Sequence, residues 1–315
     1  MFERIAIGID GGATKTRVAA REGLEGELLL DESFPGSNYN NIGVSGISEV
    51  FRDIYGALER RLGAGRISDA VLVMGSAGID RPQDAAVYSR ALYDSGFRCH
   101  TEVYNDAYIA LIGGNGGRHG ALLIAGTGSI AIGVSQENAE VRVGGWGALM
   151  SDEGSGYRLG IGAISAVMRD YDGIDRHTGL SDELLDFYGL SSPEDFVDLV
   201  YLSGELPVRK IASCAPIVLA QHEKGDQAAT EIVEGEIAGM CKMVKALGSK
   251  MGTAEFRISV GGSLLLKSDT YFGLLKRKLT ESMPLASLCK PLYEPVYGAC
   301  IIAAQSKGFQ NETGE

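Results

Sequence analysis

Asp10 opens a glycine- and threonine-rich turn near the start of the chain, between apolar runs at 5–9 and 18–20. This pattern predicts a β-hairpin, because both runs are strand-like and an Asp-Gly pair favours a tight turn. Glycines let backbone N–H groups point at an anion, while threonine and lysine add donors and positive charge. An ordinary hairpin would use the same residues, so the motif alone leaves both interpretations open. The residues here that could bind phosphate are Gly11, Gly12, Thr14, Lys15 and Thr16.

The carboxylate of Asp10 would repel a phosphate held by this turn unless a cation lay between them. Asp10 therefore predicts Mg²⁺, bound directly or through water. The net charge of −12, from 29 basic and 41 acidic residues, makes a divalent cation more necessary for binding an acidic nucleotide.

A second element of the same kind occupies residues 121–134, where two short apolar strands again meet at a small polar turn. Its candidate phosphate-binding residues are Gly126, Thr127, Gly128 and Ser129. A third glycine-rich segment, Gly261, Gly262 and Ser263, follows an apolar strand at 256–260. It fits a loop along which an adenosine could lie, although a generic strand-to-helix turn explains it nearly as well.

Asp106 follows a predicted strand at 100–104 and precedes a short predicted helix. A carboxylate at a strand end can accept a proton from a hydroxyl that attacks phosphorus. Helix capping is the alternative for Asp106, and finishing the turn is the alternative for Asn105.

The segment 144–155 is the most distinctive in the chain, with the single tryptophan, Trp146, between glycines. Gly144 and Gly145 could present N–H groups to a ligand, and the bracketing glycines suggest backbone close to that ligand. Asp152 could accept hydrogen bonds from neighbouring hydroxyls, or could cap a helix predicted from residue 151 to about 171. Asn38 lies in a loop rich in turn formers, where an asparagine usually serves to form the turn.

Together, and in this order, these motifs closely resemble the N-acetylglucosamine kinases of the BadF/BadG/BcrA/BcrD ATPase family, within the actin-like ATPase superfamily. The resemblance implies an α/β fold with two actin-like (ribonuclease H-like) domains and an active-site cleft between them. It implies Asp106 as the catalytic base and Asp10 as the Mg²⁺ residue. The sugar would contact Asn38, Asn105, Gly144, Gly145, Trp146 and Asp152. ATP would contact Gly11, Gly12, Thr14, Lys15, Gly126, Thr127, Gly128, Ser129, Gly261, Gly262 and Ser263.

The alternation of strands and helices predicts two α/β domains, and 315 residues suffice for both. We place the boundary in the glycine-rich break at 113–117. The first domain would cover 1–115 and the second 116–294. The resemblance implies that a last helix, within 295–315, packs back on the first domain. The polar tail at 308–315 is expected to fray.

Composition limits the class of protein. Apolar content of 45% and charged content of 22% are those of a globular protein, and the acidic balance argues against nucleic acid or an anionic membrane as partner. Neither a signal peptide nor a membrane span is evident. Scattered cysteines favour reduced thiols over a zinc site. The four histidines suggest no catalytic constellation. We expect a cytoplasmic homodimer that binds a sugar and ATP.

We interpret the chain as a kinase that transfers the γ-phosphoryl group of Mg·ATP to an amino sugar, N-acetylglucosamine or glucosamine, with the 6-hydroxyl as the expected acceptor. Glucose and 2-keto-3-deoxygluconate stay open as acceptors. A reductase- or dehydratase-activating ATPase with an iron–sulfur cluster is a rival from another class, disfavoured because the cysteines fall within predicted strands and helices. A sugar-responsive repressor and a filament-forming or chaperone-like ATPase are weaker rivals.

Overall fold

The structure is a computed structural model that describes residues 4–79, 81–117, 119–135, 137, 139–202 and 206–306. The predicted tail at 308–315 lies outside these ranges. Contacts divide the chain into two compact units, which separate between Gly120 and Ala121 and again between Lys290 and Pro291. Within the described ranges, no helix combines the length and apolar character that crossing a membrane requires.

The first unit is built on a sheet of five strands, counted over the described residues, in the order β3-β2-β1-β4-β5. The predicted hairpin is confirmed, because β1 and β2 pair antiparallel. β2 also pairs antiparallel with β3, whereas β1, β4 and β5 run parallel. The strands are β1 Ile5–Gly11, β2 Lys15–Glu22, β3 Leu28–Pro35, β4 Val71–Ser76 and β5 His100–Asn105.

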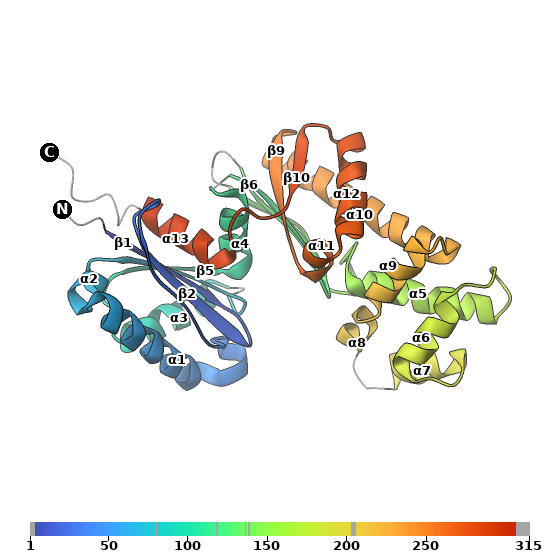
Figure 1. The fold of residues 1–315 in the computed structure, drawn as a ribbon, viewed down its shortest axis with the longest axis horizontal. Helices are drawn as coiled ribbons and strands as arrows, with labels where there is room; N and C mark the ends of the chain where they lie inside the picture. Colours follow the sequence, from blue (N-terminus) through green and yellow to red (C-terminus); the bar gives the residue numbers. More distant parts are fainter. Residues whose placement is uncertain are drawn as a thin grey trace. The chain divides into compact units, whose positions relative to one another are not determined.

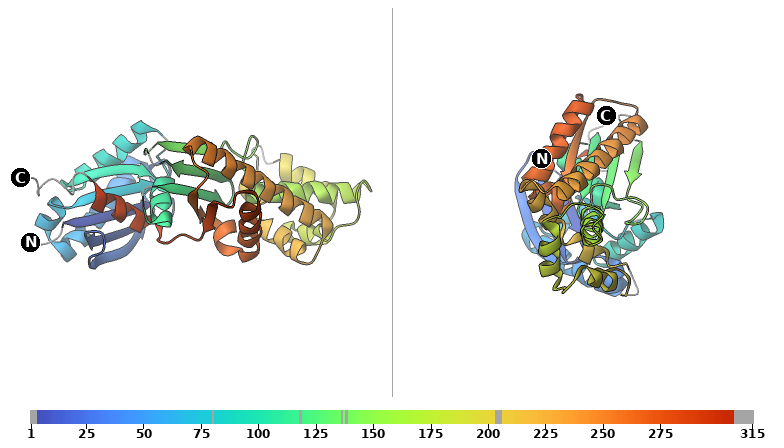
Figure 2. Two further views of the ribbon diagram at one scale, coloured as in Figure 1. Left: turned by 90° about the horizontal axis from the view of Figure 1, so that it is seen from above. Right: turned by 90° about the vertical axis from the view of Figure 1, so that its right-hand side faces the viewer.

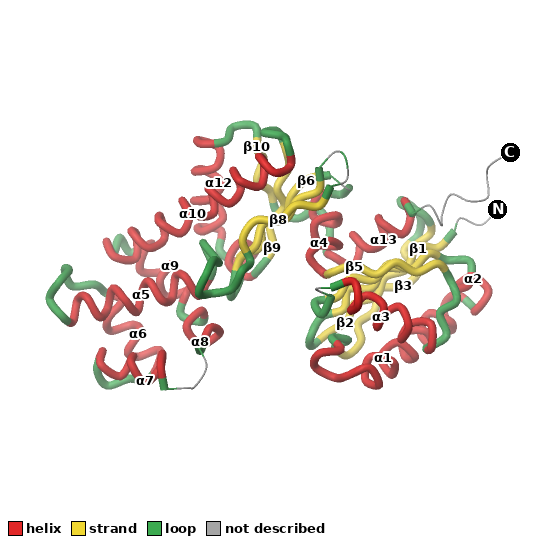
Figure 3. The backbone as a smooth tube through the Cα atoms, turned by 180° about the vertical axis from the view of Figure 1, so that it is seen from behind, coloured by secondary structure: helices red, strands yellow, loops and turns green. Residues whose placement is uncertain are grey.

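Helices cover both faces of this sheet (Figure 1). They are α1 Tyr39–Leu62, α2 Ala64–Ser68, α3 Pro82–Asp94, α4 Asp106–Asn115 and α13 Pro295–Gln305. Ile7 and Ile9 alternate along β1 and join the core under α1 and α3, because successive strand side chains point to opposite faces. Gly8 faces α13, where a Cβ would lie 2.3 Å from the carbonyl oxygen of Val296. Figure 3 shows α13 and α4 on the face opposite α1 and α3.

The segment leading into α1 differs from the sequence prediction. The turn formers at 33–43 predict a loop and the helical spacing of apolar residues at 45–61 predicts a helix, but β3 continues to Pro35 and α1 begins at Tyr39. Gly43, at φ 70°, interrupts the helical backbone. The N-cap residue Asn38 stabilises the added first turn by accepting a hydrogen bond from the amide of Asn40 at 3.0 Å.

The second unit has a sheet of five strands in the described residues, in the order β10-β9-β6-β7-β8. β9 pairs parallel with both β6 and β10, and β7 pairs antiparallel with β8, so this sheet is also mixed. The strands are β6 Gly120–Ala125, β7 Ser129–Val134, β8 Glu140–Gly144, β9 Phe256–Gly261 and β10 Ala286–Cys289. The predicted α/β class with two mixed-sheet domains is therefore confirmed.

A run of helices separates β8 from β9, and two more lie between β9 and β10. They are α5 Gly156–Tyr171, α6 Leu180–Tyr188, η1 Pro193–Asp195, α7 Phe196–Tyr201, α8 Val208–Ala212, α9 Ala215–Glu223, α10 Gln227–Met251, α11 Ser263–Lys267 and α12 Asp269–Ser282. Apolar residues spaced three and four apart over 226–251 predict a helix with one buried stripe, and α10 confirms it, since Val233, Met240 and Leu247 are fully buried. Figure 2 shows α10, in orange, extending from the strands toward the inserted helices in yellow.

The helix predicted to begin at residue 151 begins instead at Gly156, with Ser155 as its N-cap. The side chain of Ser155 accepts a hydrogen bond from the amide of Arg158 at 3.2 Å. Asp152 is therefore not a helix cap.

Candidate active site

The carboxyl ends of β1, β4 and β5 form one edge of the first sheet. The register aligns Gly11 with Ser76, and Ser76 with Asn105, so the residues that follow these strands emerge side by side. Asp10 lies one residue before this end of β1. The edge therefore collects Asp10 and the Asn105–Asp106 pair, although almost a hundred residues separate them in the sequence.

The structure shows that Asn105, and not Asp106, caps α4. Asn105 is the N-cap of α4, and its side-chain oxygen accepts a hydrogen bond from the amide of Tyr108 at 2.7 Å. Asp106 is the first residue of the helix. Because Asn105 supplies the cap, the Asp106 carboxylate is not needed for it, and the positive end of the helix dipole favours its charged form.

Asp10 carries a perturbed carboxyl group. Burial raises the pKa of Asp10, followed in size by the negative charge of Asp106, the opposing charge of Arg17 and the negative charge of Glu294, and the resulting pKa is about 6. Arg17 is held elsewhere, because its guanidinium pairs with Asp31 at 2.8 Å and with Glu294. The sheet edge thus brings two carboxylates near each other, a donor set that fits a hard divalent cation together with phosphate oxygens and water.

The first turn, residues 11–15, is fixed by its neighbours. Gly12 donates its N–H to the carbonyl of Lys15 at 3.0 Å and accepts from the amide of Ser37 at 3.1 Å. A Cβ on Gly11 would lie 2.7 Å from the hydroxyl oxygen of Ser37, so only glycine fits there. Thr14 and Lys15 are exposed, as a ligand-binding turn requires. The hydroxyl of Thr16 is buried and donates to Ser37 at 2.8 Å, so it fixes the loop.

Asn38 lies beside the end of β4, since a Cβ on Gly78 would be 3.0 Å from its side-chain oxygen. A chain of buried hydroxyls positions it. Ser76 donates to the phenol oxygen of Tyr88 at 2.8 Å, and Tyr88 donates to the carbonyl of Ser37 at 3.1 Å. Sequence reasoning missed Ser37, Ser76 and Tyr88, because nothing local signals that one tyrosine on α3 ties together the ends of β3 and β4.

The second turn, residues 126–129, joins β6 to β7 and is bound to the segment that leads into α5. Gly156 donates its N–H to the carbonyl of Gly126 at 2.7 Å, and Tyr157 to that of Thr127 at 3.1 Å. The hydroxyl of Ser129 donates to the carbonyl of Glu153 at 2.8 Å. Within the turn, Gly126 donates its N–H to the carbonyl of Gly128 at 2.9 Å, and the amide of Ser129 donates to Asp152. The amides of Thr127 and Gly128 are therefore the candidate donors to an anion.

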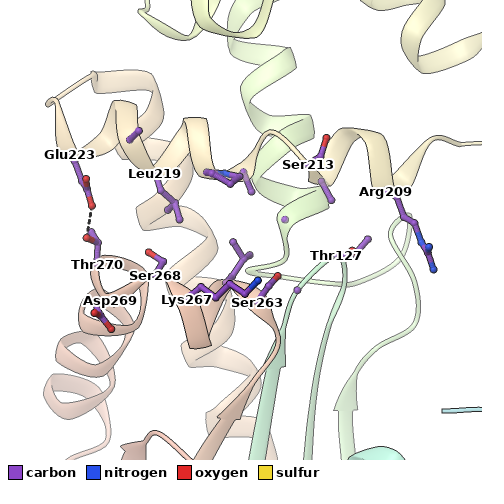
Figure 4. A pocket seen from close by; sticks show the side chains of 17 residues that line it. Thr127, Arg209, Ser213, Leu219, Glu223, Ser263, Lys267, Ser268, Asp269 and Thr270 are labelled. Atoms are coloured by element: carbon purple, nitrogen blue, oxygen red, sulfur yellow. Dashed lines mark hydrogen bonds between the residues drawn. The ribbon is translucent and has the colours of Figure 1, made fainter. Parts of the chain in front are cut away.

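A cavity of about 580 Å³ opens beside this turn, within the second unit (Figure 4). Gly126 and Thr127 line one end, and Glu223, hydrogen-bonded to Thr270, lies at the other. Between them, Leu219 points toward Lys267 from the opposite wall. The volume is typical of small-molecule sites, and the walls combine apolar side chains with polar and charged ones.

The walls of this cavity come largely from α9 and α11. α9 contributes Ala215, Pro216, Leu219, Ala220 and Glu223, and α11 contributes Ser263, Leu264 and Lys267. Of the predicted adenosine loop, Ser263 lines the cavity. Gly262, at φ 79°, is required for packing, because its Cβ would lie 2.3 Å from the carbonyl oxygen of Ala125. The α9 residues were missed, since no motif marks that part of the chain.

The Trp146 loop, residues 144–147, follows β8. Trp146 is 61% exposed, and the guanidinium of Arg142 lies 4.3 Å from its ring centroid. Arg142 also donates to the carbonyls of Gly144, at 3.0 Å, and Gly145. Gly144 and Gly145 have positive φ and lie against Met243 and Ile130. The tryptophan ring is thus oriented by an arginine that sequence reasoning did not select.

Asp152 is buried, with 6% of its surface exposed. Burial raises the pKa of Asp152, although hydrogen bonds from the backbone amides of Ser129 and Gly147 act in the opposite direction. Its carboxylate therefore lies between the second turn and the Trp146 loop.

The cysteines are unpaired with one another. Cys241, Cys289 and Cys300 lie inside secondary structure as expected, but Cys99 and Cys214 lie just before β5 and α9, where the expectation was wrong. Among the described residues, no group of three histidine, cysteine or acidic side chains could hold a metal ion by itself.

Two α/β units with one strand order, each with a glycine-rich turn at a sheet edge, define an actin-like ATPase fold of the kind that sugar kinases use. The chain belongs to the BadF/BadG/BcrA/BcrD ATPase family, whose profile matches residues 7–303.

Two curated relatives span nearly the whole chain. The N-acetylmuramic acid/N-acetylglucosamine kinase of Clostridium acetobutylicum is 30% identical over 95% of this chain and 98% of its own length. The N-acetyl-D-glucosamine kinase of Dictyostelium discoideum is 28% identical over 98% and 100%. The crystal structure of a Chromobacterium violaceum protein assigned as an N-acetylglucosamine kinase superposes with a TM-score of 0.70, at 23% identity, covering 96% of this chain and 99% of that one. This last likeness supports the fold.

Proposed function

We propose that this protein is an ATP-dependent kinase that phosphorylates a hydroxyl of an amino sugar, with N-acetylglucosamine as the leading acceptor and the 6-hydroxyl as the acceptor atom. The observation that carries the proposal is the family membership together with two relatives of that activity over at least 95% of the chain. The site geometry is consistent with it, because a candidate base and a nucleotide-sized cavity are both present.

The proposed reaction assigns the proton to Asp106. The sugar hydroxyl gives its proton to the Asp106 carboxylate while its oxygen forms a bond to the γ-phosphorus of ATP, and the bond from that phosphorus to the bridging β-phosphate oxygen breaks to release ADP. Asp106 suits this role because Asn105 caps the helix in its place. Asn38, Asn105, Gly144, Gly145, Trp146 and Asp152 are the proposed sugar residues.

The proposed nucleotide site uses both glycine-rich turns. The amides of Thr127 and Gly128, with Thr14 and Lys15, would bind the phosphates. Gly11, Gly12, Gly126 and Ser129 would shape the two turns, because the N–H groups of Gly12 and Gly126 donate to the carbonyls of Lys15 and Gly128 and that of Ser129 donates to Asp152. Gly261, Gly262 and Ser263 would border the adenosine. The cavity between α9 and α11 adds two residues to this site. Leu219 would give the base an apolar wall, and Lys267, on the opposite wall, would supply a positive charge.

Mg²⁺ would be held by Asp10, whose half-buried carboxyl group lies near the negative charge of Asp106. When bound, the ion supplies neutralisation of the charge that develops during phosphoryl transfer. Asp10 itself orients the ion or its water. The cytoplasmic location and the homodimer stay predictions.

The test is an ADP-release assay with Mg·ATP across a sugar panel. N-acetylglucosamine should give the highest kcat/KM, with glucosamine, N-acetylmuramic acid, glucose and 2-keto-3-deoxygluconate as competitors. Mass spectrometry should find one added phosphate, and NMR should place it at the 6-position. Absence of turnover with every sugar, in enzyme that hydrolyses ATP slowly, would contradict the proposal.

A further inference from the structure

Asp152 has an unusual backbone conformation. At φ 71°, it is the single non-glycine residue with positive φ in the described part of the chain. Holding a residue with a side chain in this region costs on the order of 1–3 kcal/mol, so it persists only where the surroundings impose it. Gly154, two residues further on, also has positive φ, so this segment follows a tightly constrained path.

The side chain of Asp152 bridges two loops. Its carboxylate accepts hydrogen bonds from the backbone amides of Ser129, in the second turn, and Gly147, in the Trp146 loop. A Cβ on Gly128 would lie 2.6 Å from its Oδ2 atom, so the second turn packs directly against the carboxylate. The carboxylate thus connects the two loops.

Backbone hydrogen bonds reinforce this connection on both sides. The amide of Ser151 donates to the carbonyl of Gly147 at 3.0 Å. On the other side, the hydroxyl of Ser129 and the amide of Gly156 bind the segment to the second turn, at 2.8 Å and 2.7 Å. Movement of either loop is therefore transmitted to the other through residues 151–156.

We propose that Asp152 is a positioning residue that couples the Trp146 loop to the second turn, so that binding of the sugar orders the loop that binds the nucleotide. This inference rests on the proposed function, which assigns the sugar to the Trp146 loop and the phosphates to the second turn. The ligand that binds first reduces the conformational freedom of both loops. The second ligand then loses less conformational entropy on binding, and so it binds more tightly.

Calorimetry tests the coupling by titrating N-acetylglucosamine with and without saturating Mg·ADP. The wild-type protein should bind the sugar at least about fivefold more tightly with ADP present, within the usual range of coupling between sites. Asp152→Gly removes the carboxylate while tolerating positive φ, and should bring this ratio close to one. Asp152→Asn keeps one acceptor oxygen and should restore part of it. A general loss of stability would lower both affinities and leave their ratio unchanged.

A glycine pair in the second turn provides a matched control. Gly128→Ala leaves Asp152 in the sequence but places a methyl group 2.6 Å from its Oδ2, so it should also abolish the coupling. Gly126→Ala adds the same methyl group to the same turn, where the nearest atom is 3.7 Å away. It is expected to change individual affinities and to retain the ratio. A wild-type ratio of one, or an unchanged ratio in Asp152→Gly or Gly128→Ala, would overturn the proposal.

Hydrogen exchange separates this proposal from the proposed function, because it needs no ligand. In Asp152→Gly, amides of peptides covering 126–134 and 144–151 should exchange several-fold faster than in wild type, while α10 exchanges at the same rate. If the protein binds no N-acetylglucosamine, the proposed function fails, and the exchange result still tests the connection. Unchanged exchange at 126–134 would overturn it, and faster exchange in both peptides would support it.

Discussion

The two sheets repeat one plan with different additions. In each, a hairpin of the first two strands forms a glycine-rich turn, and the last two strands lie on the other side of the first. The first unit connects β4 to β5 through the single helix α3, and its edge collects the carboxylates Asp10 and Asp106. The second unit inserts α5 to α10 before its fourth strand, and two of its helices wall a cavity.

This difference shows how one fold can supply two kinds of chemistry. Acidic groups at a sheet edge suit proton transfer and a cation, whereas a partly apolar cavity suits a nucleobase. The turn itself is common to both units, so what each does depends on the residues that follow the neighbouring strands. Variants in the two units should therefore fail in different ways.

Asp106→Asn should have the largest effect. Removing a positioned proton acceptor should lower kcat by roughly 10²–10⁴-fold, while sugar and ATP affinities change little, because the amide keeps the shape of the carboxylate. The ADP-release assay with calorimetric affinities measures both. Turnover close to wild type would remove Asp106 from the mechanism and leave the acidic edge without its proposed role.

Asp10→Asn should stabilise the ligand-free first unit at neutral pH. The folded-state pKa of about 6 lies above the 3.8 of an unperturbed aspartate, so the folded surroundings favour the neutral carboxyl group. The stability that the protonated Asp10 contributes is fully present below about pH 4 and is lost as the pH rises through about 6. At pH 7.5, in EDTA, the variant should gain up to about 3 kcal/mol in free energy of unfolding, and nothing at pH 3.5.

Urea unfolding at the two pH values measures the effect of Asp10→Asn. The exposed Asp53, on α1, provides the control, because Asp53→Asn should change stability by no more than about 0.5 kcal/mol at either pH. Equal effects of Asp10→Asn on the free energy of unfolding at both pH values would show that the pKa of Asp10 is not raised by its surroundings.

Asp10→Ala should depress turnover by about 10–100-fold and raise the Mg²⁺ concentration needed for half-maximal rate, as loss of a residue that orients a metal ion or its ligands usually does. EDTA should stop the wild-type reaction, and added Mg²⁺ should restore it. Phosphorylation at full rate in EDTA would contradict the assignment of a metal to this edge.

Leu219→Ala should affect the second unit alone. Removing an apolar wall of the cavity should raise KM for ATP by roughly 5–30-fold, about 1–2 kcal/mol, with KM for the sugar nearly unchanged. Leu266, on α11, is 44% exposed and does not line the cavity, so Leu266→Ala is the matched control. A selective rise in the sugar KM would move the nucleotide out of this cavity.

Arg142→Ala should have the smallest effect. Losing the cation–π contact with Trp146 should weaken sugar binding by about 2–5-fold, corresponding to about 0.5–1 kcal/mol. The control is a cation–π pair in the first unit, in which Arg90 lies 5.7 Å from the centroid of the Tyr93 ring on α3. Arg90→Ala should not alter sugar binding. Trp146 emission during sugar titration reports both. Equal behaviour of the two variants would contradict the proposed role of the Trp146 loop.

The sequence by itself determined the local elements and the motif positions. Apolar alternation and Asp-Gly turns specify hairpins through contacts a few residues apart, which is why β1 and β2 were predicted closely. The stripe of α10 was predicted for the same reason, because a helical period can be recognised without knowing what covers it. Boundaries were less certain, as the later start of α5 shows, since a buried Asp152 resembles a helix cap in sequence alone.

Only the tertiary structure decided which distant residues act together. The pKa of Asp10 depends on burial and on Asp106, which the parallel register brings to the same edge. Leu219 became a cavity wall because α9 packs beside the second turn, and no local pattern encodes that. Asp152 joins two loops through backbone amides, which every residue except proline possesses, so the sequence could mark Asp152 but not its partners.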